Sequence, residues 1–600
     1  MATPSTLLSR EDLDFLLHHW LDVGGLLGRP RYAEHSRETV DAVLELSEQL
    51  ATRHFAPHNK LADQNEPRMV DGRVEMIPEV GRALAAFAES GLLAAPMEPE
   101  LGGARLPRVV ATACFAWFQA ANIGTAAYPM LTRGNAALLC AHGSRGQIDT
   151  WVRPMLAGRF YGTMCLSEPQ AGSALADVAT RAEPQPDGSY RLFGTKMWIS
   201  GGDHELGENI VHLVLARTPG APAGVKGLSL FLVPKYLLEP DGRTGDRNDV
   251  SLVGLNHKMG YRGTTNAVLA FGEGRHTPGG APGAVGELVG AEHSGLACMF
   301  HMMNEARIGV GAGAAALGCT AYLKAVEYAR TRLQGRPLGD KNPSGPPVPI
   351  IEHPDVRRML LAQKAYAEGA MALILYCARL VDDKETAATA QDRQEAARLL
   401  DILTPIAKSW PSQWCLEGNH LAIQVHGGYG YTRDYDVEQH YRDNRLNPIH
   451  EGTHGIQALD LLGRRAIRDG GAALALLGDR IADTAARARK AGGDAADFAR
   501  ELHAAWSRVQ GVTATVWADG DPARALVHAT AYLEAVGHVV LAWLWLDVHL
   551  ATGSADSPFH LGKRAACRYF FRHELPKAHL RFDLLESRDG TVTETDPGWL

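Results

Sequence analysis

The sequence predicts an α+β protein with a helical N-terminal domain, a central β domain, a helical bundle and an additional helical domain at the C-terminus. Two observations support this prediction. Apolar residues recur first at helical spacing, then in strand-like alternation, and then at helical spacing again. The 600 residues also exceed what one hydrophobic core usually organises. We place the four domains at residues 1–160, 161–286, 287–466 and 467–600.

The first two domains differ in the period of their apolar residues. Up to about Arg159 the chain carries helical patterns interrupted by proline and glycine, as in residues 120–129. Residues 209–216 instead alternate, which puts their branched apolar side chains on one face of a strand. Asp187-Gly188 lies between two strand-like runs and predicts a hairpin turn. A β domain therefore follows the helical one.

Helical spacing returns in the last two domains. One apolar stripe recurs in steps of three and four over residues 356–380, and another over residues 526–550. A break rich in Gly, Ala and Asp at residues 492–496 separates helices of the last domain. The longest apolar run, residues 539–546, is far shorter than the roughly 20 residues that cross a bilayer, so no membrane span is expected.

The bulk composition is typical of a soluble enzyme. Hydrophobic residues make up 46% and charged residues 21%, and the net charge of -8 gives no general attraction to nucleic acid. The eight cysteines are scattered without a CxxC pair, which favours reduced thiols in a cytoplasm over disulfides or a zinc ribbon. The N-terminus shows no export signal. We expect a cytoplasmic protein with no nucleic-acid partner.

Two blocks hold the first functional signals: MCLSEPQAGSALAD at residues 164–177 and GTKMWISGG at residues 194–202. By itself the first block indicates a turn with free backbone N–H groups and hydroxyls, and a plain loop is the alternative. Combined with the order of the domains and with Glu451, the two blocks resemble the acyl-CoA dehydrogenase family over about residues 37–465.

The resemblance assigns the first block to FAD. Leu166 and Ser167 would line the flavin ring, while Gly172 and Ser173 would approach the FAD pyrophosphate and the CoA moiety. A flavin that is being reduced gains negative charge, so it needs fixed donors along its edge. Ala174, where the family usually has an acidic residue, changes the bonding expected within the loop rather than the binding of FAD.

The second block matches the flavin wall of the family. Trp198 would shield the ring, Ile199 would belong to the same wall, and Ser200 would bond near flavin N5. The alternative is that Trp198 is simply a buried strand aromatic.

The block NEARIGVGAG at residues 304–313 offers a GxGxG pattern. No strand precedes it, so close helix packing is a better interpretation than a dinucleotide fingerprint. Arg307 resembles the family arginine near the catalytic carboxylate and the thioester, which makes it a candidate substrate-binding residue. An ordinary ion pair at the start of a helix is the alternative.

Arg332 and the block AIQVHGGYGY, with Gln424, Gly427 and Gly428, match a further family feature. In the family these residues bind the FAD pyrophosphate and adenosine across a subunit boundary. An arginine fork suits a diphosphate, and adjacent glycines let backbone N–H groups approach closely. We therefore expect a homodimer or a dimer of dimers.

The block NPIHEGTHGIQ at residues 447–457 satisfies HExxH, the signature of zinc proteases. That motif must lie inside a helix so that both imidazoles share a face, whereas Pro448 and Gly452 indicate a loop or the start of a helix. No glutamate follows before Glu501 to act as the usual third ligand. We expect no metal site.

In the family this block supplies the catalytic base, which maps onto Glu451, with Gly452 at the substrate and Thr453 at the cofactor. Some relatives place the base beside the arginine of the first bundle helix. That position is Ala306 here, although the neighbouring Glu305 remains to be tested.

The resemblance implies an oxidoreductase that converts an acyl-CoA thioester to the trans-2-enoyl-CoA, as in fatty-acid β-oxidation. Glu451 would remove the α-proton, flavin N5 would accept the β-hydride, and an electron-transferring flavoprotein would take up the electrons. The extra C-terminal domain resembles that of the larger bacterial branch, which includes 3-methylthiopropionyl-CoA dehydrogenase and relatives that act on medium- to long-chain or phenylacyl thioesters. An acyl-CoA oxidase, passing electrons to oxygen, is one alternative.

A non-catalytic, flavin-containing relative that binds DNA is the other alternative. Its sequence feature is a basic helical stripe formed by Arg564, Arg568 and Arg572, with Lys577 and Arg581 nearby. Such stripes are more often solvated or paired with acidic neighbours.

Overall fold

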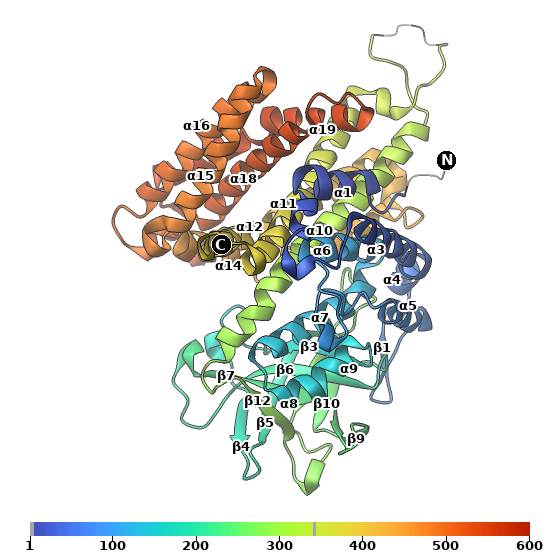
Figure 1. The fold of residues 1–600 in the computed structure, drawn as a ribbon, viewed down its shortest axis with the longest axis vertical. Helices are drawn as coiled ribbons and strands as arrows, with labels where there is room; N and C mark the ends of the chain where they lie inside the picture. The colour runs from blue at the N-terminus through green and yellow to red at the C-terminus, as the bar shows by residue number, and fades with distance from the viewer. Residues whose placement is uncertain (1–4, 340–341, 343) are drawn as a thin grey trace. The chain divides into compact units, whose positions relative to one another are not determined.

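The computed structural model describes residues 5–339, 342 and 344–600. Its chain divides into two compact units, and Figure 1 labels many of their helices and strands. Unit 1 comprises Met1–Arg37, Arg108–Ala116 and Val310–Leu600, and unit 2 comprises Glu38–Pro107 and Trp117–Gly309. The chain passes between the units at four points: after Arg37 at the start of α3 (Arg37–Leu50), at the start of α6 (Arg108–Ala121), within α6 after Ala116, and within α10 (Gly295–Thr331) after Gly309. The four domain boundaries expected from the sequence follow a different division and stay a prediction.

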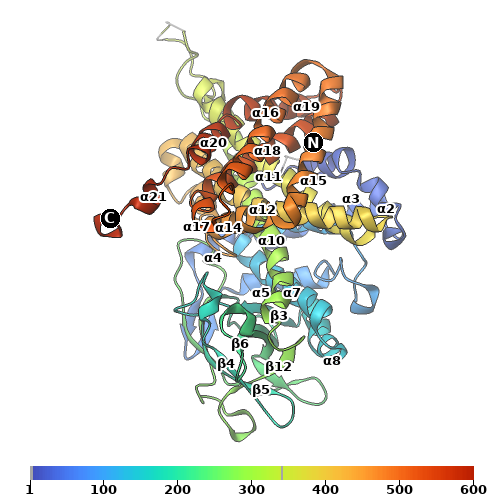
Figure 2. The ribbon, with the colours of Figure 1, turned by 90° about the vertical axis from the view of Figure 1, so that its left-hand side faces the viewer.

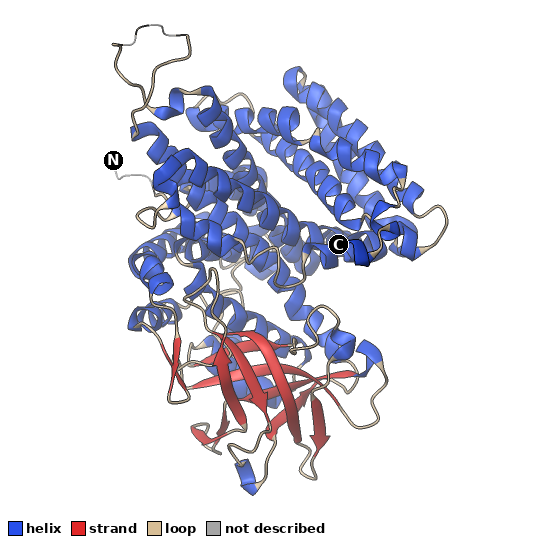
Figure 3. Cartoon of the chain, turned by 180° about the vertical axis from the view of Figure 1, so that it is seen from behind, coloured by secondary structure: helices blue, strands red, loops and turns tan. Residues whose placement is uncertain are grey.

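One eight-stranded sheet organises unit 2, and Figure 3 shows its strands gathered together. Its strands are β3 (Phe160–Cys165), β4 (Arg181–Pro184), β5 (Tyr190–Ser200), β6 (Asn209–Arg217), β7 (Leu228–Pro234), β10 (Val250–Leu255), β11 (Asn266–Phe271) and β12 (Ala284–Val289). Seven follow the order β10-β11-β5-β12-β7-β6-β3, and β4 pairs with β5. Strands β3 and β6 run parallel, whereas the neighbours of β5 are antiparallel to it. Two small sheets pair β1 (Arg68–Val70) with β2 (Arg73–Glu75) and β8 (Tyr236–Leu238) with β9 (Thr244–Arg247).

Strand β6 confirms the alternating pattern but buries both of its faces. Val211 and Leu213 pack in one hydrophobic core, and Val214 and Ala216 pack in the core on the opposite face. The hairpin turn is confirmed as well, because Gly188, with φ 85°, lies between the antiparallel strands β4 and β5. One face of the sheet therefore packs against helices, and the other encloses a core made almost entirely by the sheet's own strands.

Helices α7 (Ile123–His142) and α9 (Arg153–Leu156) of unit 2 contact the sheet through strand β3. Unit 2 also contains α4 (Asn59–Gln64), α5 (Pro78–Glu89), α8 (Arg145–Gln147), nearly all of α3 and parts of α6 and α10. Side chains of helix α7 bond to both β3 and β6: Thr132 Oγ1 accepts from the N–H of Gly162 on β3 at 3.1 Å, and Asn135 Nδ2 donates to the carbonyl of Val211 on β6 at 2.9 Å. These bonds hold the helix against the parallel pair of strands.

Unit 1 contains the predicted helical bundle. Its helices are the part of α10 from Val310 onward, α11 (Pro354–Thr386), α12 (Ala390–His426), α13 (Val437–Asn444) and α14 (His454–Asp460). Helices α11 and α12 pack along one another. The apolar stripe predicted over residues 356–380 lies within α11 and is confirmed.

The C-terminal helices also belong to unit 1, and Figure 2 shows them turned by 90°. They are α15 (Arg468–Ala491), α16 (Gly493–Val516), α17 (Pro522–Ala525), α18 (Ala529–Ala551), α19 (Pro558–Tyr569), α20 (Lys577–Ser587) and α21 (Thr591–Glu594). The predicted break is confirmed at Gly492, between α15 and α16. Leu526, expected in the long apolar helix, instead follows the short α17. Trp545 of α18 donates through Nε1 to the carbonyl of Ala365 at 3.1 Å, which ties α18 to α11.

The N-terminal segment packs with these helices. It contains α1 (Arg10–Asp14), the π-helical turn η1 (Phe15–Trp20) and α2 (Val23–Leu27). Lys563 of α19, which is 1% exposed, forms ion pairs with Asp12 of α1 and with Glu368 of α11, the latter at 2.8 Å. Three segments distant in sequence therefore meet at one buried ammonium group.

Two helices, α10 and α18, are long and apolar enough to cross a membrane by length and composition. Of their most apolar windows, 72% and 83% of residues are buried inside the protein, as in the core helices of a folded domain. All eight cysteines are free thiols, seven of them buried.

Candidate functional site

The loop after β3 presents the first group of candidate residues. Leu166 is buried, Ser167 is half-buried, and Gly172 and Ser173 are exposed. Two backbone hydrogen bonds of 2.9 and 3.0 Å close the turn at residues 168–171. No described atom lies within 4 Å of the position that a Cβ on Gly172 would take, so the backbone there is open to a ligand.

Trp198 lies at a β-bulge in strand β5. Between the pairs Lys196–Leu269 and Ile199–Ala267, β5 has two residues where β11 has one. Trp198 has a φ of 65° and is 58% exposed. A bulge redirects a side chain and is common beside active sites, whereas positive φ strains a bulky residue by about 1–2 kcal/mol. The interpretation of Trp198 as a buried strand aromatic is therefore wrong.

The neighbours of Trp198 are less exposed. Ile199 is 2% exposed and packs in the core of the sheet, so its side chain adds nothing to an exposed wall. Ser200 is half-buried, and its Oγ accepts from Asn266 Nδ2 at 3.5 Å. The N–H of Met197 donates to the carbonyl of Ser167 at 2.9 Å, which joins the two candidate segments directly.

The candidate base lies on a loop that ends where α14 begins. Glu451 has a φ of 54° and is followed by Gly452 with a φ of 91°. Thr453 caps α14, because its Oγ1 accepts from the N–H of Ile456 at 3.4 Å. Gln457 Nε2 donates to the carbonyl of Glu451 at 2.9 Å, and a Cβ on Gly452 would lie 2.6 Å from the same nitrogen. Glycine is the residue that fits there.

The HExxH pattern does not lie in one helix. His450 precedes α14, and His454 is its first residue, which confirms that the block is a loop leading into a helix. Over the described residues, these histidines and Glu451 do not bring three ligand atoms within 4.8 Å of one another. The geometry that a zinc protease requires is missing here.

Three buried asparagines connect this loop to the bundle. Asn447 Nδ2 donates to Asn444 Oδ1 at 2.9 Å, Asn444 Nδ2 donates to Asn419 Oδ1 at 2.5 Å, and Asn419 Nδ2 donates to the carbonyl of Leu317 at 3.0 Å. His450 Nε2 lies 3.0 Å from Asn447 Oδ1. The carbonyl of Leu317 can only accept a hydrogen bond, so each asparagine amide in turn must donate toward it and accept on its oxygen. The last oxygen, Asn447 Oδ1, therefore accepts from His450, which must carry its proton on Nε2.

Two neutral imidazoles flank the candidate base. Burial, together with the positive charge of Lys408, lowers the pKa of His450 to about 3. Burial, Lys408 and Arg445 lower the pKa of His454 to about 4. Both rings are therefore uncharged at pH 7, and the nearby positive charge belongs to buried Lys408 and to Arg445.

A second set of candidates lies on the surface of unit 1. Arg332, Gln424, Gly427 and Gly428 are all exposed, near the ends of α10 and α12. Arg332 Nη2 donates to Gln334 Oε1 at 3.0 Å. No described atom lies within 4 Å of the Cβ positions of the two glycines. A guanidinium and open backbone amides are groups that bind phosphates.

Arg307 is buried in the part of α10 that belongs to unit 2. Its Nη1 donates to Asn304 Oδ1 at 3.5 Å. Ala306 carries no carboxylate, and Glu305 is half-buried. Because Glu451 belongs to unit 1, the expected proximity of Arg307 to the base stays a prediction.

Sequence reasoning missed the buried residues that hold these loops. Lys196 and Glu168 form a buried ion pair at 2.8 Å. A lysine within a partly buried strand carried little signal, although a lysine that is fully buried almost always has a partner. The three asparagines carried no signal, since asparagine is common in loops and at helix ends.

The basic stripe is neutralised by acidic partners. Its ion pairs are Arg564–Asp556 (2.9 Å), Arg568–Asp494 (2.6 Å), Arg572–Glu501 (2.6 Å), Lys577–Glu574 (2.7 Å) and Arg581–Glu534 (2.7 Å). Each basic group of the stripe thus has a carboxylate beside it, which weakens its attraction for DNA phosphates. This pairing argues against the DNA-binding alternative.

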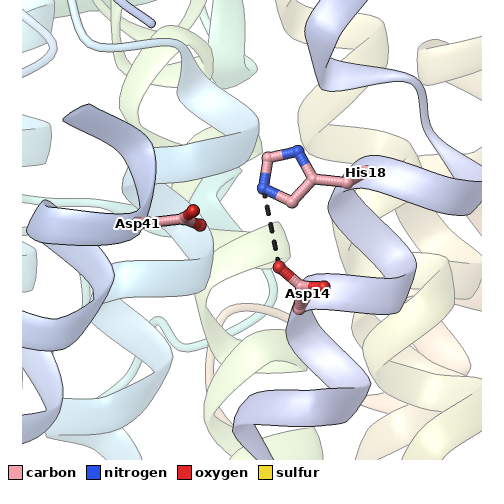
Figure 4. Close-up of side chains that lie close together, drawn as sticks. All are labelled: Asp14, His18 and Asp41. Atoms are coloured by element: carbon pink, nitrogen blue, oxygen red, sulfur yellow. Dashed lines mark ion pairs between the residues drawn. The ribbon is translucent and has the colours of Figure 1, made fainter. Parts of the chain in front are cut away.

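Asp14 and His18, one helical turn apart in unit 1, form a pair with 3.9 Å between Oδ1 and Nε2 (Figure 4). Asp41, drawn with them, belongs to unit 2.

Comparison with known proteins identifies the family. Family models match in succession: acyl-CoA dehydrogenase N-terminal domain at residues 37–159, middle domain at 163–273, C-terminal domain at 346–467, and acetyl-CoA dehydrogenase C-terminal like at 477–596. The 3-methylmercaptopropionyl-CoA dehydrogenase of Ruegeria pomeroyi is 37% identical over 94% of this chain and 95% of its own length. The chain belongs to the acyl-CoA dehydrogenase family.

Solved structures of the family share this fold. Caenorhabditis elegans ACDH-11 in complex with C11-CoA superimposes with a TM-score of 0.75 at 19% identity, over 98% of this chain and 94% of that one. Acyl-CoA dehydrogenase complexed with FAD from Bacillus anthracis gives a TM-score of 0.61 at 19% identity, over 96% and 98%. The predicted fold class is confirmed, including the additional C-terminal domain. The acyl-CoA dehydrogenases are flavoprotein oxidoreductases, and this chain is one of them.

Proposed function

We propose that this acyl-CoA dehydrogenase oxidises its thioester substrate between Cα and Cβ, with Glu451 as the base and FAD as the hydride acceptor. The position of Glu451 is the observation that supports this most strongly. Its carboxylate stands on a half-buried loop, at a φ of 54°, directly before the capped start of α14. Strained backbone of this kind persists where its surroundings hold it, and it is concentrated at functional sites.

The residues present fit a flavin. Exposed Trp198 offers an aromatic face, and the open backbone at Gly172 permits close approach. Arg332, with Gly427 and Gly428, suits a diphosphate, and we assign these residues and Gln424 to the FAD of a neighbouring subunit. This assignment makes the enzyme a homodimer or a dimer of dimers. FAD, when bound, would supply a hydride acceptor at N5.

The protein's own residues would carry out the proton chemistry. The α-hydrogen of a thioester is too weakly acidic for a carboxylate in water, so the site must exclude water and stabilise the developing enolate charge. Glu451 would take the α-proton, while the β-hydrogen leaves as a hydride and the product is the trans-2-enoyl-CoA. Arg307 and Ser173 would help to bind the substrate, as would Gly452.

For the substrate we propose 3-methylthiopropionyl-CoA or a medium- or long-chain fatty acyl-CoA. The relative from Ruegeria pomeroyi supports the first choice, and the C11-CoA complex of a protein with this fold supports the second. We propose a cytoplasmic enzyme that passes its electrons to an electron-transferring flavoprotein.

Anaerobic titration tests this function. Purified protein is titrated with 3-methylthiopropionyl-CoA and with saturated acyl-CoAs of increasing chain length, and flavin absorbance is followed. Bleaching by one thioester class in the wild type, but not in Glu451→Gln, is the expected result and names the substrate. Glu305→Gln is the matched control and should bleach like the wild type. Absence of bound flavin, or bleaching that survives in Glu451→Gln, would contradict the proposal.

Oxygen reactivity distinguishes the oxidase alternative. A dehydrogenase whose electrons go to a flavoprotein should release little peroxide during turnover in air and should turn over rapidly with that protein as acceptor. Stoichiometric peroxide would instead support an acyl-CoA oxidase.

A further inference from the structure

Unit 2 buries an ion pair beside both segments that we assign to the flavin. Lys196 lies on β5 two residues before Trp198, and Glu168 follows Ser167 on the loop after β3. The two side chains are 0% and 2% exposed, and Lys196 Nζ lies 2.8 Å from Glu168 Oε1. A buried ion pair often adds no stability over apolar residues of the same volume. Its presence here therefore needs a reason other than stability.

Each partner also bonds the chain around it. Lys196 Nζ donates to the carbonyl of Leu166 at 3.0 Å. The Glu168 carboxylate accepts from the N–H of Ala179 at 2.8 Å and from the N–H and hydroxyl of Thr180 at 3.0 and 2.5 Å. The pair thereby fastens three segments together: the loop after β3, the chain leading into β4, and the strand that carries Trp198.

Burial lowers the pKa of Lys196, but the Glu168 carboxylate opposes that shift, and a contact of 2.8 Å between Nζ and Oε1 is typical of an ammonium paired with a carboxylate. Burial would raise the pKa of Glu168, but the ammonium of Lys196 and the surrounding hydrogen-bond donors outweigh it and lower that pKa to about 2. The carboxylate is therefore ionised at neutral pH. Without Lys196, the donors of Ala179 and Thr180 would still hold it, and one uncompensated negative charge would remain beside Ser167.

We propose that Lys196 and Glu168 are positioning residues for FAD, which fix Leu166 and Ser167 relative to Trp198 and keep the net charge beside them at zero. This inference rests on the proposed function, since it requires that these segments hold the flavin. A reduced flavin carries more negative charge than an oxidised one, so a lone carboxylate nearby would make reduction harder.

Two variants test the proposal through FAD affinity and reduction potential. In Lys196→Met we expect FAD to bind the apoprotein at least tenfold more weakly, as measured by fluorescence titration. We also expect a lower potential, equivalent to a tenfold loss of affinity for reduced relative to oxidised flavin, or about 30 mV for a two-electron couple. In the double variant Glu168→Gln/Lys196→Met the potential should return to the wild-type value. Its FAD affinity should stay weak, because the carbonyl of Leu166 still lacks its donor.

Lys235→Met is the matched control. Lys235 is 2% exposed and pairs with Asp203 at 2.6 Å, but within the described chain none of its hydrogen bonds reaches the loop after β3. It should destabilise the fold without changing either flavin measurement. Wild-type affinity and potential in Lys196→Met, or equal shifts in Lys235→Met, would overturn the inference.

Folding and function failures remain distinguishable. If Lys196→Met does not fold, the double variant, which leaves no buried charge, decides the matter by its FAD affinity: weak binding supports the inference and wild-type binding overturns it. Failure of the wild-type apoprotein to bind FAD would instead overturn the proposed function.

Discussion

Trp198 and Glu451 share one unusual feature, a positive φ on a residue with a large side chain, but the protein supports them in different ways. Trp198, at 65°, lies in a bulge whose flanking residues keep their backbone pairing with β11. Glu451, at 54°, lies in a loop without strand partners and depends on side-chain amides, directly from Gln457 and indirectly through the asparagines behind His450.

The difference indicates which changes each segment tolerates. The hydrogen bonds between two strands persist when one side chain is replaced, so strand β5 around Trp198 should keep its backbone conformation in most variants. An amide network loses its geometry when one member is removed, because the remaining polar groups are left buried without partners. The loop of Glu451 should therefore be the more fragile of the two.

The largest expected effect separates a chemical role from a geometric one. Glu451→Gln should slow anaerobic flavin bleaching by about 10²–10⁴-fold, because the amide cannot accept the α-proton. Trp198→Phe should slow bleaching less, since a phenyl ring still covers part of the site. Stopped-flow absorbance measures both rates. A larger loss in Trp198→Phe than in Glu451→Gln would reverse the roles that we assign to the two segments.

The next effect tests the amide network. Asn444→Leu should lower the free energy of unfolding by about 2–4 kcal/mol, because it leaves Asn419 Oδ1 without its donor and Asn447 Nδ2 without its acceptor. It should also slow bleaching, since His450 and the neighbouring Glu451 lose their support. Urea unfolding and stopped-flow kinetics are the measurements.

Asn65→Leu is the control for this variant. Asn65 is exposed, and its Nδ2 donates to the carbonyl of Leu61 at 3.0 Å. Replacing it should change the free energy of unfolding by less than about 0.5 kcal/mol. If Asn444→Leu and Asn65→Leu behaved alike, the buried amides would not be what supports the loop.

Much of the fold could be predicted because hydrophobic period is a local property of the sequence. The strand at residues 209–216, the helix over residues 356–380 and the break at Gly492 were all visible in this way. The burial of the second face of β6 could not be predicted in this way. An alternating pattern indicates one buried face, so Val214 and Ala216 were expected on the opposite, exposed face. The pairing of Asp12 with Lys563 was also hidden, because nothing local links residues so far apart.

The site was predicted in its chemical groups but not in its geometry. Resemblance singled out Trp198 and Glu451, yet neither positive φ can be read from the sequence. The bulge at Trp198 depends on register with β11, which lies about 70 residues further along the chain. Lys196 lies within the block at residues 194–202, but its role depends on the burial of Glu168 beside it. The structure was needed for both.

A smaller effect measures the strain at the two positions. Trp198→Gly should be more stable than Trp198→Ala by about 1 kcal/mol, because both lose the side chain and only glycine adopts a φ of 65° without cost. The free energy of unfolding of Glu451→Gly should exceed that of Glu451→Ala by a similar amount. Thermal and urea unfolding of the four variants give the two differences. An alanine variant as stable as its glycine counterpart would show that the backbone relaxes there.

The smallest effect concerns protons, and here the two regions should behave alike. Burial lowers the pKa of His212, on the sheet, and of His450, beside the base, to about 3. An unfolded histidine titrates near 6.5, so the folded state binds fewer protons between these values. Each histidine therefore makes the protein most stable above pH 6.5 and progressively less stable as the pH falls toward 3.

Between pH 8 and pH 6 this linkage amounts to about 0.8 kcal/mol for each histidine. His212→Gln and His450→Gln should each reduce the loss of unfolding free energy over that interval by this amount, whatever their effect at pH 8. Urea unfolding at the two pH values measures the difference. If both variants reduce the pH-dependent loss of unfolding free energy equally, the two regions differ in how the backbone is held and not in how charge is excluded. If only His212→Gln reduces it, the loop of Glu451 admits water.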